Sequence, residues 1–299
     1  WNFNDLENPG RDSSSNGHHG QFHGSATTVP LAPPSERSSS TMAGNQVTAL
    51  HRDSEGSLWV ATDAGLSRFD GQGWINYPMV KVVGTEEARI FSIHEAREDA
   101  LWLGTYQRGV VLVEFDEADS RQASFTLLQV RDGLTDGIVR GVAVGDDGKA
   151  WFATSEATGP LEQYAGLSSY DGQSFVNYGL ADGLGSRSSL KGATALRRDS
   201  HGGFWVGTLR GVSHYDPRSL VTYGEAEGMD AGAVMAITST SDGNVWFLTG
   251  TPSQLSRFDG RRLIKMTRDD GVIGSSLNSL YVDTDGSLLV SDMLTGIVR

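Results

Sequence analysis

The side chains best suited to recognition chemistry are aromatic and basic residues that lie between runs of strand-like sequence. Aromatic planes stack on the apolar faces of sugar rings, while guanidinium, ammonium and amide groups hydrogen-bond hydroxyls and carboxylates. Eight residues of these types are candidates for ligand binding: Arg89, Tyr106, Arg108, Arg140, Tyr164, Lys191, Arg210 and Asn278. This combination predicts binding of a carbohydrate, an acidic polymer fragment or another small molecule.

Signatures of catalysis and metal binding do not occur in the sequence. The seven histidines form no HExxH pair, no serine lies in a GxSxG elbow, and no glycine run has phosphate-loop spacing. The chain has no cysteine, which excludes disulfides, thiolate zinc sites and cysteine nucleophiles. The acidic turn from Asp283 to Gly286 resembles part of a calcium loop but lacks its final glutamate. We therefore predict no catalytic residue, no metal and no cofactor, and we expect such aspartates to hydrogen-bond their own hairpins.

The overall charge and hydropathy exclude two classes of partner. The net charge of −13 comes from 37 acidic and 24 basic residues, whereas nucleic-acid binding depends on clustered lysine and arginine. We therefore expect no nucleic-acid partner. No apolar run reaches the roughly 18–20 residues that cross a bilayer, so we also expect no membrane span within these 299 residues.

The elements that must position the candidate residues follow from an internal repeat. A phrase such as "DSEGSLWVATDAGLSRFDG", at 53–71, occurs six times, and its central residues are Trp59, Trp102, Trp151, Trp205, Trp246 and Leu289. The intervals between them are 43, 49, 54, 41 and 43 residues. A small residue lies ten positions before each one: Ala49, Ser92, Gly141, Ala195, Ala236 and Ser279.

Each repeat reads as four short strands joined by glycine-bearing turns, for example 47–53, 58–62, 65–70 and 74–78. A sheet of this size cannot bury both of its faces alone, and repeats of 40–50 residues that stack in a ring are typical of β-propellers. The sequence thus predicts an all-β propeller of four-stranded antiparallel blades, with six repeats visible and six or seven blades in the ring. The small residue allows the innermost strands to approach one another.

The repeat resembles a known family. Its phrase, with "DGL" links such as Asp132-Gly133-Leu134 and Asp182-Gly183-Leu184, is similar to the two-component regulator propeller repeat over about 45–299. The resemblance implies an extracytoplasmic sensor domain of a bacterial signalling protein, in the periplasm or outside the cell. Such domains are often coupled to histidine kinases and often sense glycans. Homodimerisation would then occur through the full-length protein.

Two features concern the ends of the propeller. Residues 1–44 are rich in Ser, Gly, Pro and His and read as a linker or long loop. The last repeat stops after its third strand, and "WNFND" at the start resembles "GWINYP" of the first repeat. Residues 1–4 are therefore a candidate closing strand, and the alternative is a piece of a longer, seven-bladed propeller.

Function is expected on one face of the ring. Connections between blades, and between the second and third strands of a blade, emerge on the same face and carry most of the longer insertions. We predict a non-catalytic sensor that binds its ligand there. A first alternative is an enzyme, because "WFAT" and "WFLT" resemble repeats of streptogramin B lyase, although the loop glutamates (Glu86, Glu87, Glu156, Glu162) have no nearby histidine. A second alternative is a protein-interaction scaffold.

Overall fold

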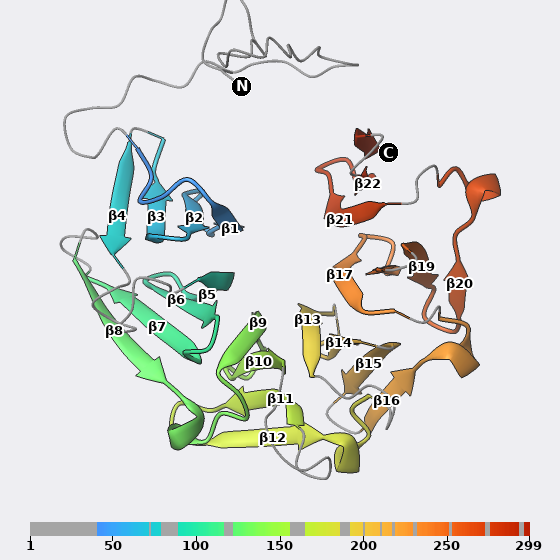
Figure 1. Cartoon of the computed structure of the whole chain (residues 1–299), viewed down its shortest axis with the longest axis horizontal. Helices are drawn as coiled ribbons and strands as arrows, with labels where there is room; N and C mark the ends of the chain where they lie inside the picture. The colour runs from blue at the N-terminus through green and yellow to red at the C-terminus, as the bar shows by residue number, and fades with distance from the viewer. Residues whose placement is uncertain are drawn as a thin grey trace, which may run out of the picture.

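Six small β-sheets are arranged around a common centre in the computed structural model of this chain (Figure 1). The structure describes residues 41–71, 73–78, 89–116, 122–155, 165–185, 192–199, 201–209, 211–216, 219–229, 232–250, 253–272, 276–292 and 296–299. Within these ranges every regular element is a β-strand or a single turn of 3₁₀ helix, and none is a helix long and apolar enough to cross a membrane.

Each sheet is an antiparallel meander whose strands follow chain order. The first three blades comprise β1 (Val47–Arg52), β2 (Leu58–Thr62), β3 (Gly65–Phe69), β4 (Trp74–Pro78); β5 (Ile90–Arg97), β6 (Ala100–Thr105), β7 (Val110–Phe115), β8 (Ala123–Leu128); and β9 (Ile138–Val144), β10 (Ala150–Ser155), β11 (Ala165–Tyr170), β12 (Phe175–Gly179). The next three comprise β13 (Ala193–Arg198), β14 (Phe204–Thr208), β15 (Gly211–Asp216), β16 (Ser219–Tyr223); β17 (Val234–Ser239), β18 (Val245–Thr249), β19 (Gln254–Phe258), β20 (Leu263–Lys265); and β21 (Leu277–Val282), β22 (Leu288–Asp292), β23 (Gly296–Val298). We call the strands of a blade A to D from the centre outward.

The predicted all-β propeller is confirmed. Five blades have four strands, and the sixth has three within the described residues. Neighbouring A strands contact one another in sequence, from β1 through β5, β9, β13 and β17 to β21. No comparable contact joins β21 to β1 in the described part of the chain, and Figure 1 shows the ring open between these two blades.

The repeated tryptophan explains why the blades stack. Trp59, Trp102, Trp151 and Trp205 are all at most 7% exposed. Each packs against the next blade, as Trp59 does against Leu101 and Leu103 of blade 2. The aliphatic residue nine positions before each anchor faces the preceding blade, and Ile93 in blade 2 and Val142 in blade 3 are 8% and 6% exposed. Burying these side chains between blades provides the main stabilisation of the ring.

The small residues of the A strands have the predicted role. A Cβ added at Gly141 would lie 2.7 Å from the Cβ of Leu196 in the next blade. At Gly207, on a neighbouring B strand, it would lie 2.8 Å from Cγ1 of Val234. Real Cβ contacts are never this short, so glycine at these positions allows adjacent blades to approach closely near the axis.

The "DGL" links are built for a tight connection between blades. In the link after β8, the carboxylate of Asp132 accepts a 2.9 Å hydrogen bond from the backbone N–H of Gln129. Gly133 then adopts a φ of +113°, which favours glycine. Leu134 follows and is buried between blades 2 and 3, beside Trp102 and Phe152. The same arrangement recurs at Asp182-Gly183-Leu184.

The link generates a stability prediction. Leu134→Ala removes a side chain that is 2% exposed and leaves a cavity between two blades, so the free energy of unfolding should fall by about 2–5 kcal/mol. Val130→Ala in the same link is the matched control, because Val130 is 55% exposed and its loss should cost less than about 0.5 kcal/mol. Urea denaturation followed by tryptophan fluorescence measures both. Equal effects of the two substitutions would contradict the role given to Leu134.

Candidate functional site

All six A strands carry a β-bulge at the same position. In β5, Ile90 pairs with Thr105 and Ser92 pairs with Gly104, so Phe91 has no partner on β6. The registers of the other five blades skip one residue in the same way. The bulged residues are Thr48, Phe91, Arg140, Thr194, Met235 and Asn278. A bulge redirects a side chain out of the regular alternation of a strand and is common beside binding sites.

These six residues, which we call the bulge ring, depart from the symmetry of the repeat. The position before each bulge is always apolar and the position after it is always small, whereas the bulged residue itself is Thr, Phe, Arg, Thr, Met or Asn. Arg140, Met235 and Asn278 are exposed. A residue that supports the architecture usually recurs from blade to blade, so the varied chemistry of the bulge ring makes it the candidate surface for recognition.

At blades 2 and 3, residues of the bulge ring contact each other and the loop that follows β6. The guanidinium carbon of Arg140 lies 5.0 Å from the ring centroid of Phe91, which is a cation–π arrangement. Nε of Arg140 donates a 3.0 Å hydrogen bond to Oγ of Ser155, at the end of β10. The ring of Tyr106, just after β6, meets Phe91 edge-on with centroids 5.7 Å apart. One guanidinium and two aromatic rings therefore form a continuous cluster.

Backbone contacts hold the loop that carries Tyr106. The N–H of Tyr106 donates to the carbonyl of Arg89 at 2.8 Å, and the N–H of Gly109 donates to the carbonyl of Gly137 at 2.7 Å. The hydroxyl of Thr105 donates a 2.8 Å hydrogen bond to the carbonyl of Gly109, which holds the two ends of the loop together. Gln107 has a φ of +63°, the one positive value outside glycine among the described residues. Strained backbone of this kind is frequent at ligand sites.

The predicted site residues separate into three groups. Tyr106 and Arg140 come together with Phe91 at blades 2 and 3, Arg89 contacts the Tyr106 loop through its backbone carbonyl, and Arg108 lies in that loop. Asn278 lies in the bulge ring on blade 6. Tyr164, Lys191 and Arg210 are outside the described residues. The sequence analysis did not name Phe91 or Met235, and the signal that could have found them is their position eleven residues before each anchor.

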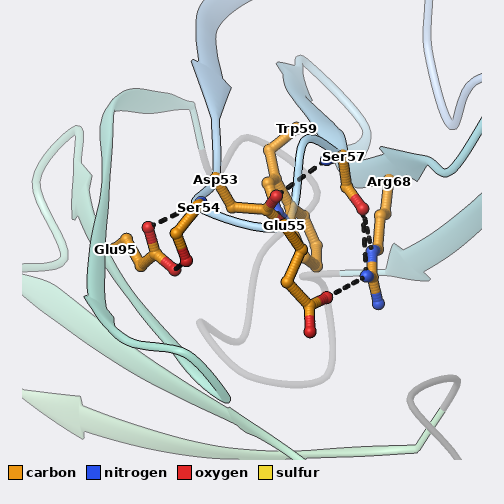
Figure 2. Close-up of polar contacts among 7 residues, drawn as sticks. All are labelled: Asp53, Ser54, Glu55, Ser57, Trp59, Arg68 and Glu95. Carbon is orange, nitrogen blue, oxygen red and sulfur yellow. Dashed lines mark hydrogen bonds and ion pairs between the residues drawn. The ribbon is translucent and has the colours of Figure 1, made fainter.

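At the opposite end of the blades, the side chains of the A–B turns stabilise the turns and the contacts between blades. In blade 1 the carboxylate of Asp53 accepts hydrogen bonds of 2.7 Å from Nε1 of Trp59 and from the N–H of Ser57 (Figure 2). The guanidinium carbon of Arg68 lies 5.4 Å from the ring centroid of Trp59, and the guanidinium donates hydrogen bonds to Ser57 and Glu55. Ser54 donates to Glu95 of blade 2 at 2.9 and 2.5 Å, so this turn also joins two blades.

The other acidic turns show the expected hairpin role. The carboxylates of Asp147, Asp242 and Asp285 accept from the N–H two residues later, at 3.2, 3.1 and 2.9 Å. Hydrogen bonds from neighbouring hydroxyl and backbone groups lower the pKa of Asp242 and Asp285. Within the described residues no group of three or more His, Asp or Glu side chains is arranged to hold a metal ion.

Two histidines occupy equivalent places near this end of the A strands. The rings of His51 and His94 lie 5.8 Å apart, across blades 1 and 2. Burial lowers the pKa of His94 to about 4, and His51 and Arg197 act in the same direction, against the opposing charge of Glu95. Burial also lowers the pKa of His51. Both histidines are therefore neutral at pH 7.

The sequence matches one family model. Residues 41–64 match the two-component regulator propeller, which confirms the resemblance predicted from the repeat. The match covers the entry into blade 1, its A–B turn and strand β2. A comparison with curated protein sequences found no match.

Solved structures share the fold at low identity. The extracellular domain of BT3049 from B. thetaiotaomicron, described as a hybrid two component system, has a TM-score of 0.67 at 19% identity over 85% of this chain and 33% of its own. The extracellular domain of BT4673 from the same organism has a TM-score of 0.64 at 17% identity over 89% and 34%. Virginiamycin B lyase from Staphylococcus aureus has a TM-score of 0.63 at 13% identity over 85% and 80%.

The similarity to these solved structures shows a shared fold. The chain spans about a third of the length of the two sensor chains and most of the length of the lyase. Regulators and enzymes thus share this propeller architecture, so function must be argued from the side chains of this chain.

The buried histidines generate a pH prediction. His94 has a pKa of about 4 in the folded chain and about 6.5 when unfolded, so the unfolded state binds more protons between these values. The free energy of unfolding should therefore fall as the pH drops from about 6.5 to 4, by roughly 2–3 kcal/mol from this group. His94→Gln should flatten that part of the stability curve, measured by urea denaturation at each pH. His201→Gln is the control, because His201 is exposed and should leave the slope unchanged.

Proposed function

We propose that this chain is a non-catalytic sensor propeller that acts outside the cytoplasm and binds a carbohydrate or a similar small molecule at the bulge ring. The observation that carries the proposal is the cluster of Arg140, Phe91 and Tyr106 at the rim of the ring. The regulator model that matches residues 41–64 and the fold shared with extracellular domains of two-component systems support the sensor role.

The chemistry of the cluster suits a sugar. The two aromatic rings offer apolar surface to the C–H face of a pyranose, and Tyr106 is 37% exposed. The guanidinium of Arg140 presents a planar fork of donors to hydroxyls or to a carboxylate. Arg89 and Arg108, whose backbones lie at the Tyr106 loop, add two positive charges to this part of a chain whose net charge is −13. Among carbohydrates, this local charge favours an acidic one.

Signalling requires that the ligand distinguishes two states of the protein. The loop that carries Tyr106 contacts both blade 2 and blade 3 through Arg89 and Gly137. A ligand bound there is in position to bias the packing of the two blades, and it would shift the full-length protein toward the state that it binds more tightly. The output and any dimerisation would lie in the rest of that protein.

A lyase activity is the second candidate, because the fold covers 80% of the virginiamycin B lyase chain, which was solved with quinupristin. The four histidines within the described ranges argue against it. His51 and His94 lie near the A–B end of their strands, His201 lies in an A–B turn, and His214 bonds Asp199 of that turn at 2.6 Å. None of these four is at the bulge ring.

The binding prediction starts from a glycan array that includes uronic acids, followed by calorimetric titration of each ligand found. Arg140→Ala and Phe91→Ala should each weaken binding about 10-fold or more, because each removes roughly 1.4 kcal/mol or more of contact energy. Arg140→Lys should restore less than half of the lost binding energy, because lysine lacks the planar fork. Arg262→Ala is the control, since its side chain is 78% exposed at a C–D turn.

Two results would overturn the proposal. One is a ligand whose affinity is the same for the Arg140, Phe91 and control variants. The other is opening of the quinupristin ring by the purified chain with Mg²⁺, followed by mass spectrometry, which would make the chain an enzyme.

A further inference from the structure

In three blades the bulged side chain contacts one particular position of its own blade, the residue four positions after the anchor. In blade 2 this residue is Tyr106, whose ring meets that of Phe91 with centroids 5.7 Å apart. In blade 3 it is Ser155, whose Oγ accepts a 3.0 Å hydrogen bond from Nε of Arg140. The end of the B strand therefore supports the bulged side chain of the same blade.

Blade 5 shows the same contact with a smaller partner. A Cβ added at Gly250 would lie 2.6 Å from Sδ and 3.4 Å from Cγ of Met235. The side chain of Met235 therefore lies against the glycine, and a larger residue at that position would displace it. The residues at this position in blades 1 to 5 are Asp63, Tyr106, Ser155, Leu209 and Gly250. They vary from blade to blade, as the bulged residues do.

Two contacts hold the guanidinium of Arg140. Its Nε–H is bonded to Ser155, which is 3% exposed, and the ring centroid of Phe91 lies 5.0 Å from its central carbon. A guanidinium binds a two-oxygen acceptor either through Nε and one Nη group or through both Nη groups. The bond to Ser155 occupies the first arrangement. Neither Nη group of this exposed side chain has a hydrogen-bond partner in the described part of the chain, so the second arrangement is open.

We propose that Ser155 is a positioning residue that holds Arg140 so that its two Nη groups remain open for a carboxylate of the ligand. The inference rests on the proposed function of the bulge ring and narrows the ligand to one that bears a carboxylate. A carboxylate accepts two parallel hydrogen bonds from this edge and carries the opposite charge, whereas a single hydroxyl oxygen does not match the spacing of both groups. Ser155 thus acts through Arg140 and contributes selectivity without touching the ligand.

The role of Ser155 can be tested without a ligand, by NMR of the isotope-labelled chain. The Nε–H of Arg140, assigned by its loss in Arg140→Lys, should exchange with solvent at least about fivefold more slowly than that of Arg261, which is exposed. Ser155→Ala should raise the Arg140 exchange rate at least about fivefold, because it removes the acceptor, and Ser155→Thr, which keeps the hydroxyl, should raise it less than about twofold. Ser168→Ala is the matched control, since it removes another buried hydroxyl of blade 3, bonded to Thr135 at 3.0 Å.

The ligand class is tested by calorimetric titration of methyl β-D-glucuronide, its methyl ester and methyl β-D-glucoside 6-sulfate. The native chain should bind the glucuronide at least about 10-fold more tightly than the ester, which has lost the charge and the second equivalent oxygen. Ser155→Ala should reduce this ratio at least about threefold and leave the affinity for the ester unchanged. Ser168→Ala should leave the ratio unchanged.

Each contrary result has a distinct meaning. An Arg140 exchange rate that Ser155→Ala leaves unchanged would overturn the role of Ser155 and leave the proposed binding function intact. Equal affinities for the glucuronide and its ester, no binding of either, or tighter binding of the sulfate would overturn the carboxylate. Ligand binding that Arg140→Ala does not weaken would overturn the proposed function together with this inference.

Discussion

Burial of apolar side chains between blades is the interaction on which the structure depends. A sheet of four short strands has two faces to bury and no partner within its own repeat, so each blade is stable only against its neighbours. The comparison of Leu50 with Ile93 and Val142 makes this visible. These residues hold the same place in the repeat, yet Leu50 is 64% exposed while the others are 8% and 6% exposed. The difference arises because, within the described residues, only Ile93 and Val142 have a preceding blade packed against them.

The need to bury side chains between blades determines the residue type at several positions of the repeat and leaves other positions variable. The anchor, the aliphatic residue nine positions before it and the small residue ten positions before it all lie in contacts between blades. The bulge turns the residue eleven positions before the anchor out of the strand's alternation. Its identity changes from blade to blade, and its contacts change with it: Thr194 donates a hydrogen bond to the carbonyl of Val234 in the next blade, whereas Arg140 lies over Phe91 of the preceding blade. The proposed recognition site and the contacts that hold the ring together thus use adjacent residues of one strand.

The fold was predictable from the sequence because it rests on features that recur. Spacing of the anchors indicated six units, and turn residues indicated four strands in each complete unit. Arg140 and Asn278 were named from the sequence because they are polar and lie beside strand-like runs, and the structure places both at the bulged position of their A strands. Phe91 was missed because an aromatic residue in a strand reads as core, and only the pairing of Ile90 with Thr105 and of Ser92 with Gly104 shows that it is displaced. The amino-acid composition of a strand does not reveal a one-residue shift in its pairing register.

The two ends of the blades differ for a physical reason. At the A–B end, Asp53 satisfies the indole N–H of a buried tryptophan and the backbone of its own turn, so a change there leaves a buried donor without a partner. Blade 3 shows what such a change does, because Gly145 replaces the aspartate and Nε1 of Trp151 is buried with no hydrogen-bond partner among the described residues. At the bulge ring the residue type is not repeated from blade to blade, and Arg140 and Phe91 contact each other across two blades. The proposed recognition site therefore lies at the end of the blades where the side chains vary, away from the aspartates that the buried tryptophans require.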